Sequence, residues 1–204
     1  MSGLPNLPPA EVREIATPHG PARAHVRLAA QPRGTLVLGH GAGGGVDATD
    51  LRAAARAALS VGVSVVLSEQ PYRVAGRRAP APAAQLDTAW LTVVADFPGP
   101  LVFGGRSSGA RVACRCAAEG KAAGVFCLAF PVHPPGKPEK HRMAEIDGVE
   151  VPVLVVQGSR DPFGMPPSTP TREVVVVEGD HSLRKASAEI ERVLPGFLDR
   201  LLPP

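Results

Sequence analysis

The strongest constraint on the fold of this 204-residue chain is an alternation, from Thr35 onward, of short apolar runs with helical patterns. Runs such as Val153–Val156 lack polar alternation, which is typical of strands covered on both faces. Strands separated by helices of ten or more residues indicate βαβ crossovers. We therefore predict an α/β fold with a mostly parallel, doubly wound sheet, in a single domain spanning residues 1–204.

The periodicity and the turn residues place the individual elements along the chain. The expected strands are Glu11–Thr17, Ala22–Leu28, Thr35–Leu38, Val63–Leu67, Leu101–Phe103, Val125–Ala129, Val153–Val156 and Glu173–Val177, the first two forming an N-terminal β-hairpin. The expected helices are Asp50–Ser60, Ala83–Asp96, Ser108–Ala118 and Leu183–Leu201. Pro71–Pro82 and Pro131–Val149 read as loops, and the second is too short to hold a helical cap, so no cap domain is expected.

Composition and charge argue against several classes of protein. The net charge of +3 comes with scattered arginines, which does not predict a nucleic-acid interface. Cys114, Cys116 and Cys127 form neither a disulfide framework nor a zinc site, so no metal and no cofactor are expected. Met1–Ala10 has no apolar core of a signal peptide, and no apolar run reaches the ~20 residues of a membrane span. We expect a cytoplasmic monomer or homodimer.

The segment Gly105-Arg106-Ser107-Ser108-Gly109 follows an expected strand and opens an expected helix. This is the G-x-S-x-G context of a nucleophile elbow, a turn so tight that only glycine fits two residues before and after the serine. Ser108 as nucleophile would place Arg106 at one of these crowded positions. The pattern therefore predicts Ser107 as the nucleophile.

A glycine-rich loop, Gly39–Gly45, follows the strand that begins at Thr35. Beside a nucleophile elbow, such a loop supplies one backbone N–H to an oxyanion hole, here most simply from Ala42. The second N–H comes from Ser108, the residue after the nucleophile.

The same loop also matches G-x-G-x-x-G through Gly39, Gly41 and Gly44, and Glu69 closes the next strand where a ribose-binding acid would stand. In a dinucleotide site the glycines open the helix directly, whereas here further residues intervene, with Asp47 or Thr49 as the expected helix cap. A nucleotide-binding oxidoreductase is the less favoured alternative.

Two further strand ends carry the residues that a serine nucleophile needs. Asp161 follows Val153–Val156, and His181 follows Glu173–Val177. Since the carboxyl ends of parallel strands share one edge of the sheet, Ser107, Asp161 and His181 are expected to converge there. The chain order Ser, Asp, His is that of α/β-hydrolases and differs from the orders in chymotrypsin and subtilisin. Asp180, beside the histidine, is a weaker choice for the acid.

These motifs together make the chain resemble the α/β-hydrolase superfamily from about Thr35 to the end. More closely, it is similar to small dienelactone-hydrolase-like proteins of the group that includes testis-expressed protein 30 and NSL-complex subunit 3. The resemblance rests on HGAGGG at His40–Gly45, GGRSSGARVA at Gly104–Ala113, FPVHPPGKPEK at Phe130–Lys140, QGSRDPFG at Gln157–Gly164 and GDHSL at Gly179–Leu183.

The resemblance implies a Ser-His-Asp triad at Ser107, His181 and Asp161 and an oxyanion hole at Ala42 and Ser108. Dienelactone hydrolase itself uses a cysteine nucleophile, so its lactone substrate does not carry over to a chain with Ser107. Some relatives serve as scaffold subunits, so membership of the fold does not guarantee turnover.

The expected activity is hydrolysis of a small acyl ester, or a related acyl compound, through an acyl-serine intermediate. A catalytically silent interaction module is the alternative. The candidate substrate-lining residues lie on loops at the strand ends and are Gly43, Tyr72, Arg73, His133 and Phe163. Arg73 or Arg106 would favour acidic substrates, unless Arg106 points into solvent.

Overall fold

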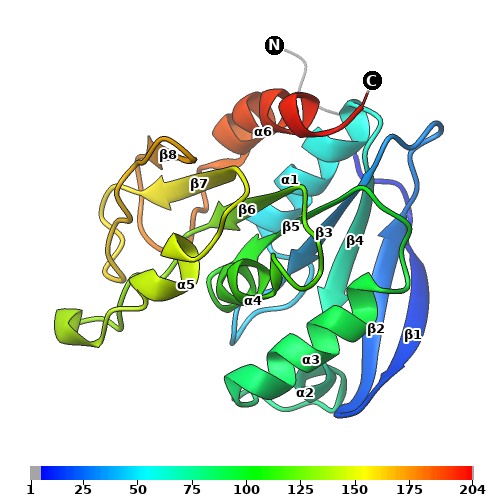
Figure 1. Cartoon of the computed structure of the whole chain (residues 1–204), viewed down its shortest axis with the longest axis horizontal. Helices are drawn as coiled ribbons and strands as arrows, with labels where there is room; N and C mark the ends of the chain where they lie inside the picture. Colours follow the sequence, from blue (N-terminus) through cyan, green and yellow to red (C-terminus); the bar gives the residue numbers. More distant parts are fainter. Residues whose placement is uncertain (1–5, 204) are drawn as a thin grey trace.

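The computed structural model describes residues 6–203, so the first five residues of the proline-rich N-terminal lead lie outside it. Its centre is one eight-stranded sheet with the order β1-β2-β4-β3-β5-β6-β7-β8 (Figure 1). The strands are β1 Glu11–Thr17, β2 Gly20–Arg27, β3 Thr35–Gly39, β4 Ser64–Glu69, β5 Leu101–Arg106, β6 Gly124–Leu128, β7 Val153–Gly158 and β8 Arg172–Val177. β2 pairs antiparallel with β1 and β4, and β3 to β8 are parallel, which confirms the predicted hairpin and the mostly parallel sheet.

Helices cover both faces of the sheet, as the apolar strands require (Figure 1). They are α1 Thr49–Ser60, α2 Pro71–Val74, α3 Ala83–Val94, α4 Ser108–Cys116, α5 Met143–Asp147 and α6 Ser187–Leu201, with a short 3-10 helix η1 at Pro138–Lys140. Within residues 6–203 none of them is both long enough and apolar enough to span a membrane.

Successive residues of each central strand enter two separate cores. In β3, Val37 packs with the side chains of α3 and α4, whereas Leu36 and Leu38 pack with those of α1 and α6. β6 repeats the pattern, with Phe126 on the α1 and α6 side and Cys127 on the α3 and α4 side. The side-chain period of two therefore distributes one apolar strand between two layers of helix.

Several element boundaries differ from the sequence prediction. The last helix begins at Ser187 rather than Leu183, because Leu183 has a left-handed φ of 49° and anchors a turn with its buried side chain. The expected loop Pro71–Pro82 begins with α2, whose first residue is a proline with a helix-compatible φ. Helix α1 is preceded by Ala48, so neither Asp47 nor Thr49 is its cap.

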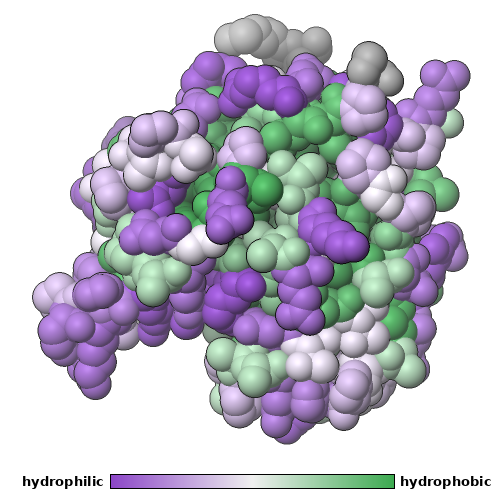
Figure 2. Space-filling view, in the orientation of Figure 1, coloured by the Kyte–Doolittle hydropathy of each residue, from purple (hydrophilic) through white to green (hydrophobic). Residues whose placement is uncertain are grey.

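The segment between β6 and β7 holds η1 and α5 rather than only a loop, but no larger insertion. The part around η1 projects from the body of the protein and is hydrophilic on its surface (Figures 1 and 2). Within residues 6–203, this segment therefore forms no helical cap, as the sequence predicted.

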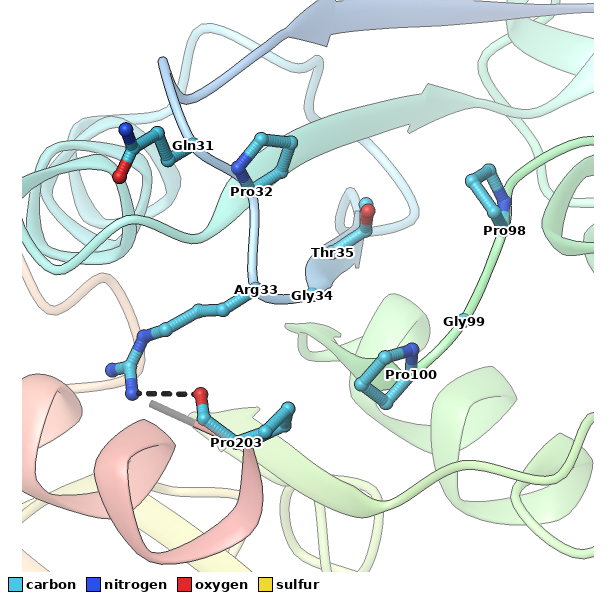
Figure 3. Close-up of a pocket in the computed structure, with 9 residues that line it drawn as sticks. All are labelled: Gln31, Pro32, Arg33, Gly34, Thr35, Pro98, Gly99, Pro100 and Pro203. Atoms are coloured by element: carbon cyan, nitrogen blue, oxygen red, sulfur yellow. Dashed lines mark hydrogen bonds between the residues drawn. The ribbon is translucent and has the colours of Figure 1, made fainter.

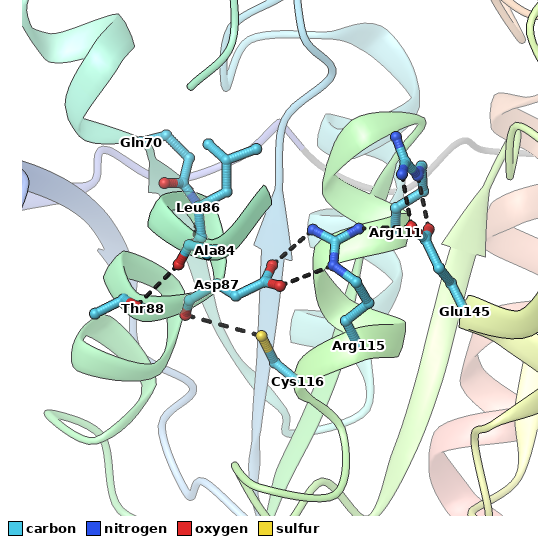
Figure 4. Close-up of polar contacts among 9 residues, drawn as sticks. All are labelled: Gln70, Ala84, Leu86, Asp87, Thr88, Arg111, Arg115, Cys116 and Glu145. Atoms are coloured by element: carbon cyan, nitrogen blue, oxygen red, sulfur yellow. Dashed lines mark hydrogen bonds and ion pairs between the residues drawn. The ribbon is translucent and has the colours of Figure 1, made fainter. Parts of the chain in front are cut away.

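Three helices on one face are joined by a row of half-buried charges (Figure 4). Arg115 of α4 donates to both carboxylate oxygens of Asp87 on α3, at 2.6 and 2.8 Å. Glu145 of α5 accepts from Arg115 at 3.2 Å and from Arg111 of α4 at 2.6 and 2.7 Å. These contacts fix the segment between β6 and β7 to the helix that begins beside Ser107.

We predict that Arg115→Met lowers the free energy of unfolding by about 1–3 kcal/mol, because it leaves Asp87 and Glu145 partly buried with fewer charge partners. Arg192→Met is the matched control, since Arg192 pairs with Glu189 on the exposed side of α6. It should cost less than about 1 kcal/mol. Urea unfolding of both variants measures the difference, and equal losses would contradict the assignment.

Candidate active site

The residues around Ser107 form a tight turn between β5 and α4. Ser107 itself has φ 53° and ψ −107°, a strained conformation for a residue with a side chain. A Cβ added to Gly105 would lie 2.6 Å from the Gly39 carbonyl oxygen, and one on Gly109 would lie 2.2 Å from the same atom. Only glycine therefore allows β3 to approach the turn this closely, as the sequence pattern predicted.

The structure brings Ser107, His181 and Asp161 into one hydrogen-bonded chain, although they come from three different strand ends. His181 Nε2 lies 2.8 Å from Ser107 Oγ, and His181 Nδ1 lies 2.8 Å from Asp161 Oδ2. The carboxylate accepts from Nδ1–H, which leaves Nε2 free to accept from the serine hydroxyl. Asp180, the rejected acid, is exposed and instead accepts from Ser182.

Asp161 is held in place by two further donors. Its Oδ1 accepts from the backbone N–H of Phe163 at 2.8 Å, and its Oδ2 also accepts from Gln157 Nε2 at 2.9 Å. Gln157 is fully buried and donates as well to the Gly164 carbonyl, at 2.8 Å. Sequence analysis did not single out Gln157, whose only signal is a polar residue at the end of an apolar strand.

Phe163 contributes its ring as well as its backbone. The ring stacks on the His181 imidazole with centroids 4.1 Å apart and an interplanar angle of 29°. The Phe163 carbonyl accepts from the His133 N–H at 3.0 Å, so two of the expected lining residues are neighbours, and one of them lies against His181.

The glycine-rich loop lies directly against the serine. A Cβ added to Gly41 would lie 3.8 Å from Ser107 Cβ. Neither the Ala42 N–H nor the Ser108 N–H donates a hydrogen bond within residues 6–203. Both groups are therefore free to bind a ligand, as an oxyanion hole requires.

Two buried side chains beneath the loop fix its peptide groups. His40 Nδ1 lies 2.8 Å from the Gly41 carbonyl oxygen, which also accepts from Gly44 N–H at 3.1 Å. Because a trans peptide points its N–H opposite to its carbonyl, these bonds set the direction of the Ala42 N–H. Tyr72 is buried and its hydroxyl donates to the Ala42 carbonyl at 2.8 Å, so it supports the loop from below.

The other candidate lining residues occupy different positions. Gly43 lies exposed in the loop, with nothing within 4 Å of an added Cβ. Arg73 is half-buried on α2, and its guanidinium donates to the Arg77 carbonyl at 3.2 Å.

Arg106 points neither into solvent nor toward an open binding surface. Its Nε lies 2.8 Å from Oδ2 of Asp50, a buried carboxylate on α1, so its charge is already paired within the protein. This pairing removes the expectation that Arg106 selects acidic substrates.

The geometry also differs from a dinucleotide site. β3 ends at Gly39 and α1 begins only at Thr49, so the glycines do not form the N-terminus of the helix. Glu69, the proposed ribose-binding acid, lies 3.6 Å from His25 Nε2.

A cavity of about 690 Å³ lies at the opposite edge of the sheet, near the residues that precede β3 and β5 (Figure 3). Its one charged residue, Arg33, donates to the carbonyls of Val61 and Pro203 and pairs with Asp199. Each guanidinium nitrogen of Arg33 thus already has a partner within the protein. The candidate site remains the edge that carries Ser107.

Burial of His40 gives the site a testable pH dependence. Burial lowers the pKa of His40 below its ordinary value of 6.5, and the neutral ring accepts from the Gln70 N–H at 3.1 Å. The unfolded chain therefore binds this proton more readily than the folded protein. The free energy of unfolding should fall as the pH drops below about 6.5, until the folded ring is also protonated.

His40→Gln keeps an acceptor in reach of Gln70 but cannot titrate. We predict that it loses less stability than the native protein between about pH 7 and about pH 5, measured by urea unfolding at each pH. His141→Gln changes an exposed histidine and should leave the native pH dependence intact. Identical pH dependences for the native protein and His40→Gln would refute this role.

Solved structures of similar architecture include several hydrolases. An α/β serine hydrolase without lid from Xanthomonas campestris, XC6422, has a TM-score of 0.78 and 21% identity, over 98% of this chain and 99% of that one. The Pyrococcus furiosus esterase Pf2001 has a TM-score of 0.76 and 16% identity, over 95% of this chain and 91% of that one. Est1E from Butyrivibrio proteoclasticus has a TM-score of 0.75 and 15% identity, over 93% and 98%.

No curated protein matches this chain significantly in sequence. Residues 32–192, from just before β3 into α6, match the family described as "Alpha/beta hydrolase domain". This match covers more than half of the chain and includes every residue of the Ser107 site described above. The chain therefore belongs to the alpha/beta hydrolase domain family.

Proposed function

We propose that this protein is a serine hydrolase that cleaves small acyl esters, or related acyl compounds, through an acyl-serine intermediate. The observation that carries the proposal is the continuous hydrogen-bonded chain Ser107–His181–Asp161, with 2.8 Å at each step. A strained nucleophile and a buried orienting acid are costly features that a purely structural domain does not need. They favour a hydrolase over a catalytically silent interaction module.

In the first half of the reaction, Ser107 Oγ attacks the substrate carbonyl carbon while His181 Nε2 takes its proton. The C–O bond to the leaving group then breaks, and His181 returns the proton to the departing oxygen. In the second half, His181 Nε2 removes a proton from water, whose oxygen attacks the acyl carbon. The C–O bond to Ser107 Oγ then breaks, His181 returns the proton to Ser107 Oγ, and the acid is released. Asp161 keeps the proton of the neutral ring on Nδ1 and stabilises the imidazolium formed in each half.

The oxyanion formed in both steps is bound by the N–H groups of Ala42 and Ser108. Ser108 is the first residue of α4, so the positive end of that helix dipole also faces the site. Losing one such donor typically costs ~10²–10³ in turnover. His40 and Tyr72 fix the direction of the Ala42 N–H without contacting the substrate.

The substrate class follows from how open this edge of the sheet is. The segment between β6 and β7 carries only η1 and α5, and Glu145 fixes α5 to α4. No cap covers Ser107 in the part of the chain that the structure describes. Such a site suits a small acyl compound lying against Gly43, His133 and Phe163. Membership of the dienelactone-hydrolase-like group, and a monomeric or homodimeric state, stay predictions.

Replacing the nucleophile tests the proposal directly. Ser107→Ala should abolish labelling by a fluorophosphonate probe and lower kcat on p-nitrophenyl acetate by ~10⁴–10⁶-fold. Ser168→Ala removes an exposed serine and should leave both properties unchanged. A native protein that takes up no probe and cleaves no ester in a panel of esters and thioesters would instead support the silent module.

A matched pair of carboxylates tests the assignment of the acid. Asp161→Asn presents an amide to His181 and favours the wrong imidazole tautomer, so we expect kcat to fall by about 10³–10⁴-fold. Asp180→Asn changes the neighbouring exposed aspartate and should alter kcat less than about twofold. Steady-state kinetics on the same ester measures both. The reverse ranking would make Asp180 the orienting acid.

A further inference from the structure

Arg106 is the last residue of β5 and immediately precedes Ser107, and its guanidinium contacts Asp50 and the backbone of His181 and lies near the glycine-rich loop. Its Nε lies 2.8 Å from Asp50 Oδ2 at the start of α1. Its Nη2 donates to the His181 carbonyl at 3.0 Å. Its Nη1 lies 3.2 Å from the position of a Cβ added to Gly41, in the loop that carries Ala42.

Asp50 holds the charge of the guanidinium in place at the start of α1. The side chain of Asp50 is only 2% exposed, and its other oxygen accepts from the Leu51 N–H at 2.9 Å. A buried carboxylate is costly without a charge partner, so Asp50 and Arg106 hold each other. The contact with Asp50 is an ion pair, and the hydrogen bond from Nη2 to the His181 carbonyl adds the directional contact that orients the planar guanidinium.

The contact with His181 matters because it is made to the backbone. Asp161 and Ser107 contact the imidazole, but the position of the ring also depends on where the chain between β8 and α6 holds its Cα. Arg106 supplies a bond from the residue next to the nucleophile to the residue that bears the base. Asp161 and Phe163 contact the ring, and Arg106 contacts the backbone of the same residue.

We propose that Arg106, held by its ion pair with Asp50, is a positioning residue. It fixes the positions of Ser107, His181 and the glycine-rich loop Gly39–Gly45 relative to one another. This inference rests on the proposed hydrolase function for its kinetic consequence. Its structural content, that Arg106 sets the distance between Ser107 and His181, stands apart from activity.

The conservative substitution Arg106→Lys keeps the positive charge but replaces a rigid guanidinium with three donor nitrogens by one flexible ammonium. We expect the protein to stay folded, kcat to fall by about 10–100-fold, and KM to change little, since a misplaced base slows chemistry more than binding. In a crystal structure of the variant, Ser107 Oγ and His181 Nε2 should lie more than about 3.5 Å apart. Arg192→Lys, at an exposed position on α6, should change none of these properties.

Arg106→Ala provides a second test, with guanidinium added far below denaturing concentrations. Guanidinium should restore part of kcat by occupying the vacated place beside Asp50, whereas ammonium should not. If Arg106→Ala does not fold, the variant Asp50→Asn is tested in its place. It weakens the ion pair that holds Arg106, so kcat should fall with little change in KM.

The outcomes separate the two proposals. If the native protein lacks probe labelling at Ser107, the hydrolase function fails, and the Ser107–His181 distance in Arg106→Lys still decides the role of Arg106. If Arg106→Lys retains native kcat and the native 2.8 Å contact, the positioning role is overturned while the hydrolase function stands.

Discussion

The site depends on one close contact between the backbones of glycine residues, where the end of β3 meets the turn between β5 and α4. Gly39 faces Gly105 and Gly109 so closely that a methyl group on either of the latter two would overlap its carbonyl oxygen. This approach sets α4 directly over the end of the sheet and leaves Ser107 at a positive φ, with its hydroxyl raised toward His181. The positions of the sheet, α4 and Ser107 therefore depend on the absence of side chains at these glycines.

Around this contact, the site uses buried polar groups whose bonds are directed at backbone carbonyls. His40 and Tyr72 hold the carbonyls of Gly41 and Ala42, and Arg106 holds that of His181. Hydrogen bonds to the main chain fix a loop without depending on the neighbouring side chains. Such an arrangement suits a site without a cap, because the loops must keep their geometry while one side faces water.

The row of charges from Asp87 to Glu145 has a comparable role at a distance from the serine. It joins α3, α4 and α5, so the segment between β6 and β7 is held beside the sheet rather than over the site. These ion pairs have limited exposure, so they hold α5 against α4 more firmly than surface pairs would.

The sequence by itself determined the sheet class and the strand ends at which Ser107, Asp161 and His181 lie, and its glycine spacing favoured Ser107 over Ser108 as the proposed nucleophile. Apolar strands, glycine spacing and chain order are local patterns that reflect steric and burial requirements directly. Only the tertiary structure decided that Arg106 pairs with Asp50 and that Gln157 donates to Asp161. It also decided that Tyr72 donates to the glycine-rich loop. These contacts join residues from different elements, or depend on the direction in which a side chain of a loop points. Neither periodicity nor composition encodes which buried donor meets which acceptor, because that depends on how the helices pack on the sheet.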